Sequence, residues 1–129
     1  MNRLNLESCQ VGATIIEIED GPEEALVLKF KGGIDQADPC EFLDPLFQQV
    51  HDACLAARVP QVSADFTELK FCNSSGIKAI INWAMLQMDV APEDRYPLQF
   101  VYSKKITWQQ TSLKAITLLA RGIVTAQAV

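Results

Sequence analysis

The sequence predicts an α/β fold in which helices cover a mixed sheet of four to five strands. Along the chain, segments in which every second residue is apolar predict strands, and segments with apolar residues at helical spacing predict helices. Their order is strand, strand, helix, strand, helix, strand, helix. A helix between two strands predicts a parallel crossover, and the short turn between the first two strands predicts a hairpin. The 129 residues, of which 49% are hydrophobic and 21% charged, suit a single domain spanning residues 1–129.

The hairpin is predicted near the beginning of the chain. Residues 14–19 (TIIEIE) are β-branched and alternate with charge, and residues 25–31 (ALVLKFK) place every second apolar side chain on one face. Asp20-Gly21-Pro22 between them is a turn sequence. Gly32-Gly33 then breaks the alternation, so we expect the second strand to end there.

The first helix is predicted over the apolar-periodic segment that follows. Asp38 and Pro39 supply a capping side chain and a first-turn proline. Pro45 interrupts the segment, and it either kinks the helix or, with Asp44 before it, marks the true start. The helix should end near Arg58, ahead of a further proline.

The second half continues with a strand over residues 61–66 (QVSADF) and, after a brief turn, with the run that leads into Asn73-Ser74-Ser75-Gly76. The next helix shows the clearest apolar periodicity in the chain, which predicts as its core face Ile77, Ile80, Ile81, Ala84, Met85 and Met88. Another strand is predicted over residues 98–102. A last helix is predicted over residues 106–121, and Gly122 is expected to end it. Ile123-Val124 can form a short final strand.

Two adjacent hydroxyls and a glycine stand where the second helix begins. Ser74 or Asn73 can accept a hydrogen bond from a free backbone N–H of the first turn, and Gly76 permits close approach of backbone or of a partner. The free N–H groups and the helix dipole also suit a phosphate, including one carried by a serine of the chain itself. Local chemistry alone favours a plain helix cap.

The surroundings of this corner resemble the signature of STAS domains, the anti-sigma factor antagonist family. Residues 65–81 (DFTELKFCNSSGIKAII) keep the register of its pattern, in which an Asp ends a strand and Asp-Ser-Ser-Gly opens an apolar helix. Residues 28–35 (LKFKGGID) resemble its strand-Gly-x-x-Asp segment, and residues 99–102 with the last helix and Gly122 resemble its end. The resemblance spans about residues 14–124 and implies the STAS fold.

The resemblance implies partner switching without enzymatic activity of the chain itself. The unmodified protein would bind and sequester an ATP-using anti-sigma kinase, and phosphorylation of the first motif serine would break the complex. Carried over to this chain, the acceptor is Ser74, with Ser75 as neighbour or substitute, and Asp35 lies near the binding face. The expected partner-binding residues are Asp35, Asn73, Ser74, Ser75, Gly76, Lys78 and Trp83.

Asn73 departs from the family pattern, which usually has Asp at this position. The change removes a negative charge beside the acceptor, so it either alters kinase recognition or marks a branch that does not signal by phosphorylation. In that alternative the chain is an accessory subunit of a transporter or of a larger signalling complex.

Composition argues against several other classes of function. The net charge of −5 and scattered basic residues oppose a nucleic-acid partner. The four cysteines form no CxxC pair and there is one histidine, so no metal or other cofactor is expected. The N-terminus lacks an apolar signal core and no run reaches 18 apolar residues, so a cytoplasmic protein without membrane insertion is expected. We expect a monomer or weak homodimer.

Individual side chains away from the motif point mainly to structure. His51 is expected on a solvated helix face, because no Ser and Asp set around it suggests a triad. Cys54 and Cys72 stand in apolar surroundings and are expected in the core. Trp83 falls beside the apolar stripe of its helix, where it either packs at the edge of the core or serves as an interface hot spot.

Overall fold

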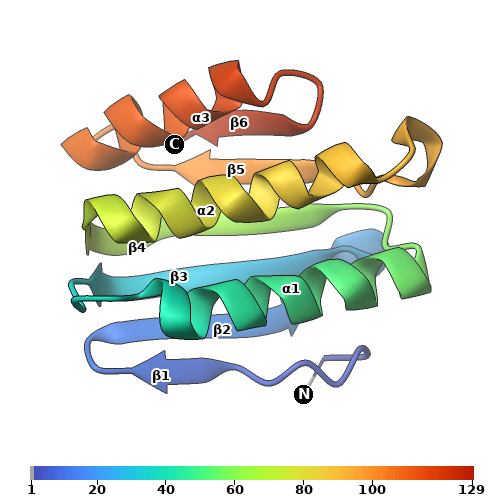
Figure 1. Ribbon diagram of the computed structural model, residues 1–129, viewed down its shortest axis with the longest axis horizontal. Helices are drawn as coiled ribbons and strands as arrows, with labels where there is room; N and C mark the ends of the chain where they lie inside the picture. The colour runs from blue at the N-terminus through green and yellow to red at the C-terminus, as the bar shows by residue number, and fades with distance from the viewer. Residues whose placement is uncertain (1) are drawn as a thin grey trace.

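The computed structural model describes residues 2–129 as two layers, a six-stranded sheet and helices that cover one of its faces (Figure 1). The strands lie side by side in chain order, and they are β1 Cys9–Val11, β2 Thr14–Asp20, β3 Leu26–Ile34, β4 Val62–Cys72, β5 Leu98–Tyr102 and β6 Val124–Ala128. Pairing is antiparallel from β1 to β3 and parallel from β3 to β6. The predicted mixed α/β sheet is confirmed, with β1 as the strand that the sequence pattern did not predict.

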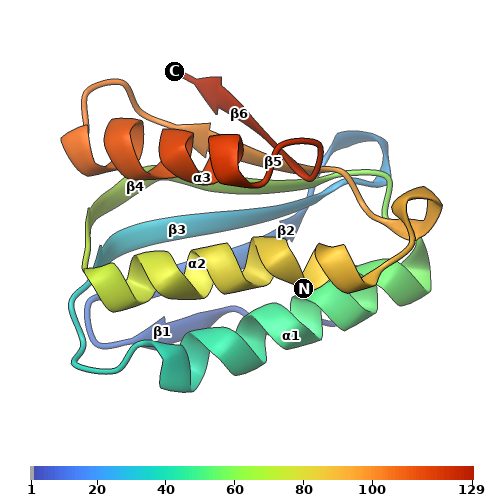
Figure 2. The same cartoon turned by 45° about the horizontal axis from the view of Figure 1, so that its top comes forward.

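The helices are α1 Cys40–Ala57, α2 Ser74–Leu86 and α3 Lys114–Leu119, the last continuing a π-helical segment, Gln109–Leu113. Each parallel crossover moves one strand further along the sheet in the same direction, so right-handed connections put all three helices on the same face. Figures 1 and 2 show this arrangement, with α2 between α1 and α3. Strands β2 to β6 each contribute one or more buried side chains to the core, whereas the residues of β1 are half-buried or exposed.

The second strand does not end at Gly32-Gly33. β3 runs through both glycines to Ile34, and its register against β4 shifts between them. Gly32 has φ +82°, and a Cβ there would lie 2.0 Å from the carbonyl oxygen of Ala13. The glycines therefore permit an irregularity inside β3. The strand continues past it because β3 stays paired with β2 on one side and with β4 on the other. The brief turn expected after residue 66 is likewise part of β4.

Helix α1 begins at Cys40 behind Pro39, passes through Pro45 and ends at Arg58, which adopts the left-handed conformation. The prediction that His51 lies on a solvated face of this helix is wrong, because its side chain is buried. Its Nδ1 lies 2.8 Å from the hydroxyl of Tyr96, and that oxygen also accepts a hydrogen bond from the indole of Trp83 at 3.2 Å. The loop after α2 supplies Tyr96, and sequence spacing along α1 did not reveal this contact.

The core face of α2 is rotated from the predicted one. Met85 and Met88 are 39% and 54% exposed, whereas Trp83 is fully buried. Trp83 stacks on Phe47 of α1 with ring centroids 4.7 Å apart. The large aromatic side chain of Trp83 therefore packs in the contact between α1 and α2. Met85 and Met88 lie on the side of α2 that faces away from α1. Cys54 and Cys72 are buried as predicted.

The face of the sheet opposite the helices is polar. Two ion pairs connect β2 and β3 there, Glu19 with Lys29 at 3.2 Å and Glu17 with Lys31 at 2.7 Å. These are exposed pairs that contribute little each, so the helical side supplies most of the stability. Within residues 2–129, no helix is long and apolar enough to span a bilayer.

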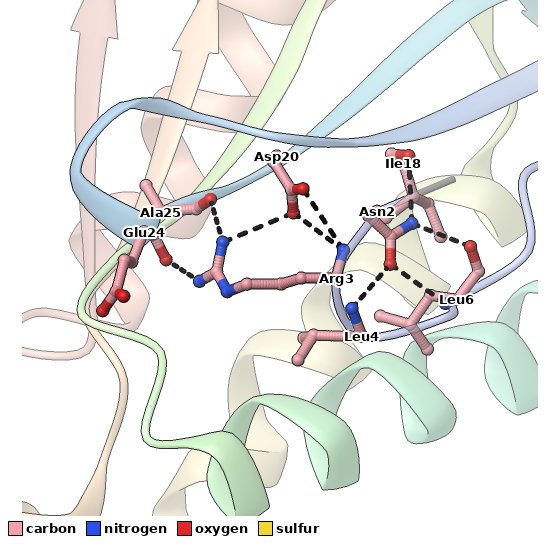
Figure 3. Close-up of polar contacts among 8 residues, drawn as sticks. All are labelled: Asn2, Arg3, Leu4, Leu6, Ile18, Asp20, Glu24 and Ala25. Carbon is pink, nitrogen blue, oxygen red and sulfur yellow. Dashed lines mark hydrogen bonds and ion pairs between the residues drawn. The ribbon is translucent and has the colours of Figure 1, made fainter.

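The N-terminal segment is held against the β2–β3 hairpin (Figure 3). The backbone N–H and guanidinium of Arg3 contact the carboxylate of Asp20, and the guanidinium also donates to the carbonyl of Glu24. The amide of Asn2 donates to the carbonyl of Ile18 at 3.1 Å. This segment lies far from the end of the sheet where the motif residues are found.

Candidate functional site

The motif residues lie at the carboxyl end of the parallel strands, where loops meet at one edge of the sheet (Figure 1). Strand β4 ends at Cys72 and α2 begins at Ser74, with Asn73 between them in an extended conformation (φ −76°, ψ 173°). The loop that follows β3 carries Asp35 at the same edge. The predicted site residues on these two loops are therefore brought together.

Asn73 is the residue that caps α2. Its side-chain oxygen accepts a hydrogen bond from the backbone N–H of Gly76 at 2.8 Å, and its carbonyl accepts from the N–H of Ile77 at 3.0 Å. Of the two capping candidates, the structure thus selects Asn73 over Ser74. The exposed Ser74 side chain makes none of the hydrogen bonds found among residues 2–129. A cap on the preceding residue leaves this hydroxyl available to an external reactant.

The side chain of Asn73 also bridges to the β3–α1 loop. Its Nδ2 donates to the carbonyl of Gln36 at 2.8 Å, and its backbone N–H donates to the carbonyl of Ile34 at 3.0 Å. The Gly76 N–H requires an oxygen opposite it, so the amide nitrogen must face Gln36. An ionised Asp has no proton to donate there. The structure therefore has a specific use for Asn at the position where the family pattern has Asp.

Gln36 extends this connection to the first hairpin. Its Nε2 donates to the carbonyl of Val11 at 2.8 Å and to the hydroxyl of Thr14 at 3.1 Å. That hydroxyl in turn donates to the carbonyl of Gly33 at 2.7 Å. A chain of hydrogen bonds thus runs from the β1–β2 turn through the β3–α1 loop to the start of α2. The loops that present Asp35 and Ser74 are held in one fixed arrangement.

Gly76 serves packing and not partner contact. It is buried, and a Cβ at this position would lie 2.7 Å from the Sγ of Cys72 and 2.8 Å from a methyl carbon of Ile34. A helix start that lies this close to the ends of β3 and β4 has no room for a side chain. The expectation that Gly76 contacts a partner is therefore replaced by a structural role.

The remaining predicted residues divide by exposure. Asp35, Ser74 and Lys78 are exposed and Ser75 is half-buried, so the side chains of all four reach the surface. Trp83 does not, because it is fully buried against Phe47. Of its two alternatives, packing in the core is the correct one.

Phe71 is a surface residue that the sequence analysis did not assign to the site. Its side chain is 53% exposed, and it pairs with Gly33 at the end of the sheet, two residues before the Asn73 cap. A large exposed aromatic at a loop edge is typical of an interface. The sequence shows Phe71 only as an apolar residue before the Asn-Ser-Ser-Gly corner. Its pairing with Gly33, which offers no side chain to cover it, depends on the register of β3 and β4.

Two thiols beside the motif are not reactive nucleophiles. Burial raises the pKa of Cys72 to about 12. Burial and the nearby carboxylates of Asp44 and Asp38 raise the pKa of Cys40, whose thiol donates to the carbonyl of Ser75 at 3.6 Å. Both thiols stay protonated at neutral pH, and the reactive form of cysteine is the thiolate. Residues 2–129 also include no group of three His, Cys, Asp or Glu side chains placed to hold a metal.

The arrangement defines a two-layer α/β domain with a rigid, exposed loop edge around an Asn-Ser-Ser-Gly helix start. It is similar to the crystal structure of an anti-sigma factor antagonist from Mycobacterium paratuberculosis, with a TM-score of 0.58 and 17% identity over 91% of this chain and 90% of that one. It is also similar to an uncharacterised protein of the DUF3478 family with a SpoIIAA-like fold from Shewanella loihica PV-4, with a TM-score of 0.52 and 15% identity over 94% and 90%.

No protein-family model matches the sequence, and no curated protein matches it either. The structural similarity covers nearly the whole chain at low identity, so it concerns the fold. The chain has the SpoIIAA-like fold of STAS domains, which confirms the fold that the sequence motif implied.

Proposed function

We propose that this protein is a partner-switching regulator without catalytic activity of its own. In its unmodified form it binds a kinase-type anti-sigma factor through the loop edge that carries Asp35, Phe71 and Ser74. The observation that carries the proposal is the exposed Ser74 hydroxyl, which Asn73 frees by taking over the cap of α2. The similarity to an anti-sigma factor antagonist supports the same function.

The modification is a phosphoryl transfer to Ser74. The Oγ of Ser74 attacks the γ-phosphorus of Mg-ATP held by the kinase, a P–Oγ bond forms, and the bond to the bridging oxygen of ADP breaks. A base on the kinase takes the hydroxyl proton. The product carries a charge of about −1.5 to −2 at the first residue of α2, where the helix dipole stabilises it by about 0.3–1 kcal/mol.

The new charge would release the partner because it stands on a surface that binding must dehydrate. Phe71 is half-exposed and lies close to the motif along the chain, so a docked partner would remove water from both. Dehydrating a phosphate without a matching cation is costly. The partner would therefore leave without any change of the fold.

Asn73 is compatible with this mechanism. Its amide is required for the bond to the carbonyl of Gln36, so the departure from Asp has a structural cause. Loss of phosphorylation is not needed to account for it. The alternative, an accessory subunit of a transporter or signalling complex, would bind through the same edge without phosphate.

The test is phosphorylation by the cognate kinase in Mg-ATP, followed by mass mapping of the modified residue. We expect labelling of the wild-type protein, labelling of Ser75→Ala, and loss of labelling in Ser74→Ala. Equal labelling of Ser74→Ala and wild type would contradict the assignment. Native protein that carries no phosphate at Ser74 and copurifies with a membrane-associated partner would favour the accessory subunit.

A further inference from the structure

A second surface begins at Ile77, about one helical turn beyond Ser74, and extends along helices α2 and α3. Along α2 and the turn after it, four apolar residues recur at i, i+4, i+8 and i+11 on one side of the helix, namely Ile77, Ile81, Met85 and Met88. On α3, Leu118 and Leu119 are 60% and 74% exposed. We call these six residues the α2–α3 apolar face.

The apolar side of α2 faces α3. Asn82 and Leu86 lie on the opposite side of α2, where they line a small hollow together with residues of α1 that include Phe47. Helix α2 lies between α1 and α3 in both views (Figures 1 and 2). The side with Ile77 and Ile81 therefore points toward α3. These two residues are half-buried against the core, whereas Met85 and Met88 further along the same side are exposed.

The charges beside this face are mainly basic, although Asp89, the neighbour of Met88, is an exposed acidic residue. All sixteen acidic residues of the chain lie before residue 95, and helix α2 contains none of them. From residue 95 to the end the chain carries five basic residues, Arg95, Lys104, Lys105, Lys114 and Arg121. Lys78 on α2 and Lys114 and Arg121 on or beside α3 are exposed. In a protein of net charge −5, this surface is basic and apolar at once.

We propose that the α2–α3 apolar face binds an amphipathic helix of a partner protein, apolar along one side and acidic along its flanks. The stripe from Ile77 to Met88 is about 16 Å long, which matches about three turns of a helix. Helices bind such faces through apolar anchors at helical spacing, and flanking charges of opposite sign set their orientation.

Two other occupants fit the observations less well. The chain's own amphipathic acidic helix, α1, has its apolar side buried in the core, so a second copy cannot offer it. An anionic membrane would attract the basic residues locally, but the net charge of −5 opposes approach of the whole protein. The partner-helix proposal does not require phosphorylation of Ser74, although Ser74 begins the same helix.

The test uses a fluorescein-labelled synthetic helix of about 16 residues, with leucines on one face and glutamates on both flanks, titrated with the full chain in an anisotropy assay. A peptide of the same composition with its leucines redistributed is the control. We expect binding of the amphipathic peptide alone, weaker at higher salt. Amide chemical-shift changes in the labelled protein should concentrate on α2 and α3 and spare the loop around Asp35.

Variants at exposed positions keep the fold and report on the face. Leu119→Glu and Met85→Glu should each weaken binding about tenfold, because each removes an apolar anchor and adds a repulsive charge. Val129→Glu changes an apolar residue that is 59% exposed outside the face and should leave binding unchanged. Equal binding of both peptides, or shifts outside α2 and α3, would overturn the proposal. Preferential binding to vesicles of anionic phospholipid, lost in the same variants, would overturn it in favour of a membrane.

Discussion

Replacement of Asn73 tests how the candidate site is held together. Asn73→Ala removes the cap on Gly76 N–H and the bond to the Gln36 carbonyl, both 2.8 Å long. Loss of an N-cap costs about 1 kcal/mol, and loss of a neutral hydrogen bond about 1 kcal/mol more. We therefore expect Asn73→Ala to lower the free energy of unfolding by about 2 kcal/mol at pH 7.

Asn73→Asp separates the two contributions. The carboxylate keeps the cap and gains from the helix dipole, but it cannot donate to Gln36 and places a charge opposite that carbonyl. We expect a loss smaller than that of Asn73→Ala. Urea denaturation followed by circular dichroism measures both, and Asn73→Ser, which restores only the cap, serves as a control. An Asp variant as stable as the wild type or more so would refute the role assigned to the Gln36 bond.

Three further changes have outcomes that the structure specifies. Gly76→Ala should lower the free energy of unfolding by about 1–3 kcal/mol through overpacking, and Cys72→Ala in the same chain should recover part of that loss; an unchanged stability would contradict the close approach. Phe71→Ala should change stability by less than about 0.5 kcal/mol yet weaken binding of the anti-sigma partner, and a loss of stability without loss of binding would make it a core residue. Burial lowers the pKa of His51, outweighing the opposite effect of Asp52, so the unfolded chain binds the proton more readily. Stability should therefore hold above about pH 6.5 and fall below it in urea titrations, and His51→Gln should flatten that dependence.

Local patterns along the chain predicted the fold class correctly. The order of alternating and helical segments predicted a mixed sheet with parallel crossovers, and the helix end at Arg58 and the final strand after Gly122 were also predicted. These features depend on periodicity and turn residues, which neighbours in sequence determine. The likeness of residues 65–81 to STAS domains added the topology, which the similarity to solved structures confirms.

Met88 and His51 were placed wrongly, and Trp83 was left between two alternatives, for one shared reason. Each lies on a helix whose exposed side depends on what packs against it. Trp83 is drawn inward by stacking on Phe47. His51 is buried because a tyrosine from a distant loop reaches its ring. The spacing of apolar residues within a helix predicts that the helix has a buried face. Which side of the helix is buried depends on the residues that pack against it, and these are remote in sequence.

The sequence by itself determined the order of elements, the helix start at the Ser-Ser-Gly corner and the imbalance of charge between the two parts of the chain. Only the tertiary structure decided that Asn73 caps the helix while bonding Gln36, and that the hydroxyl of Ser74 stays exposed. The physical reason is that a cap satisfies backbone groups a few residues away, whereas the second bond of Asn73 requires a loop 37 positions earlier.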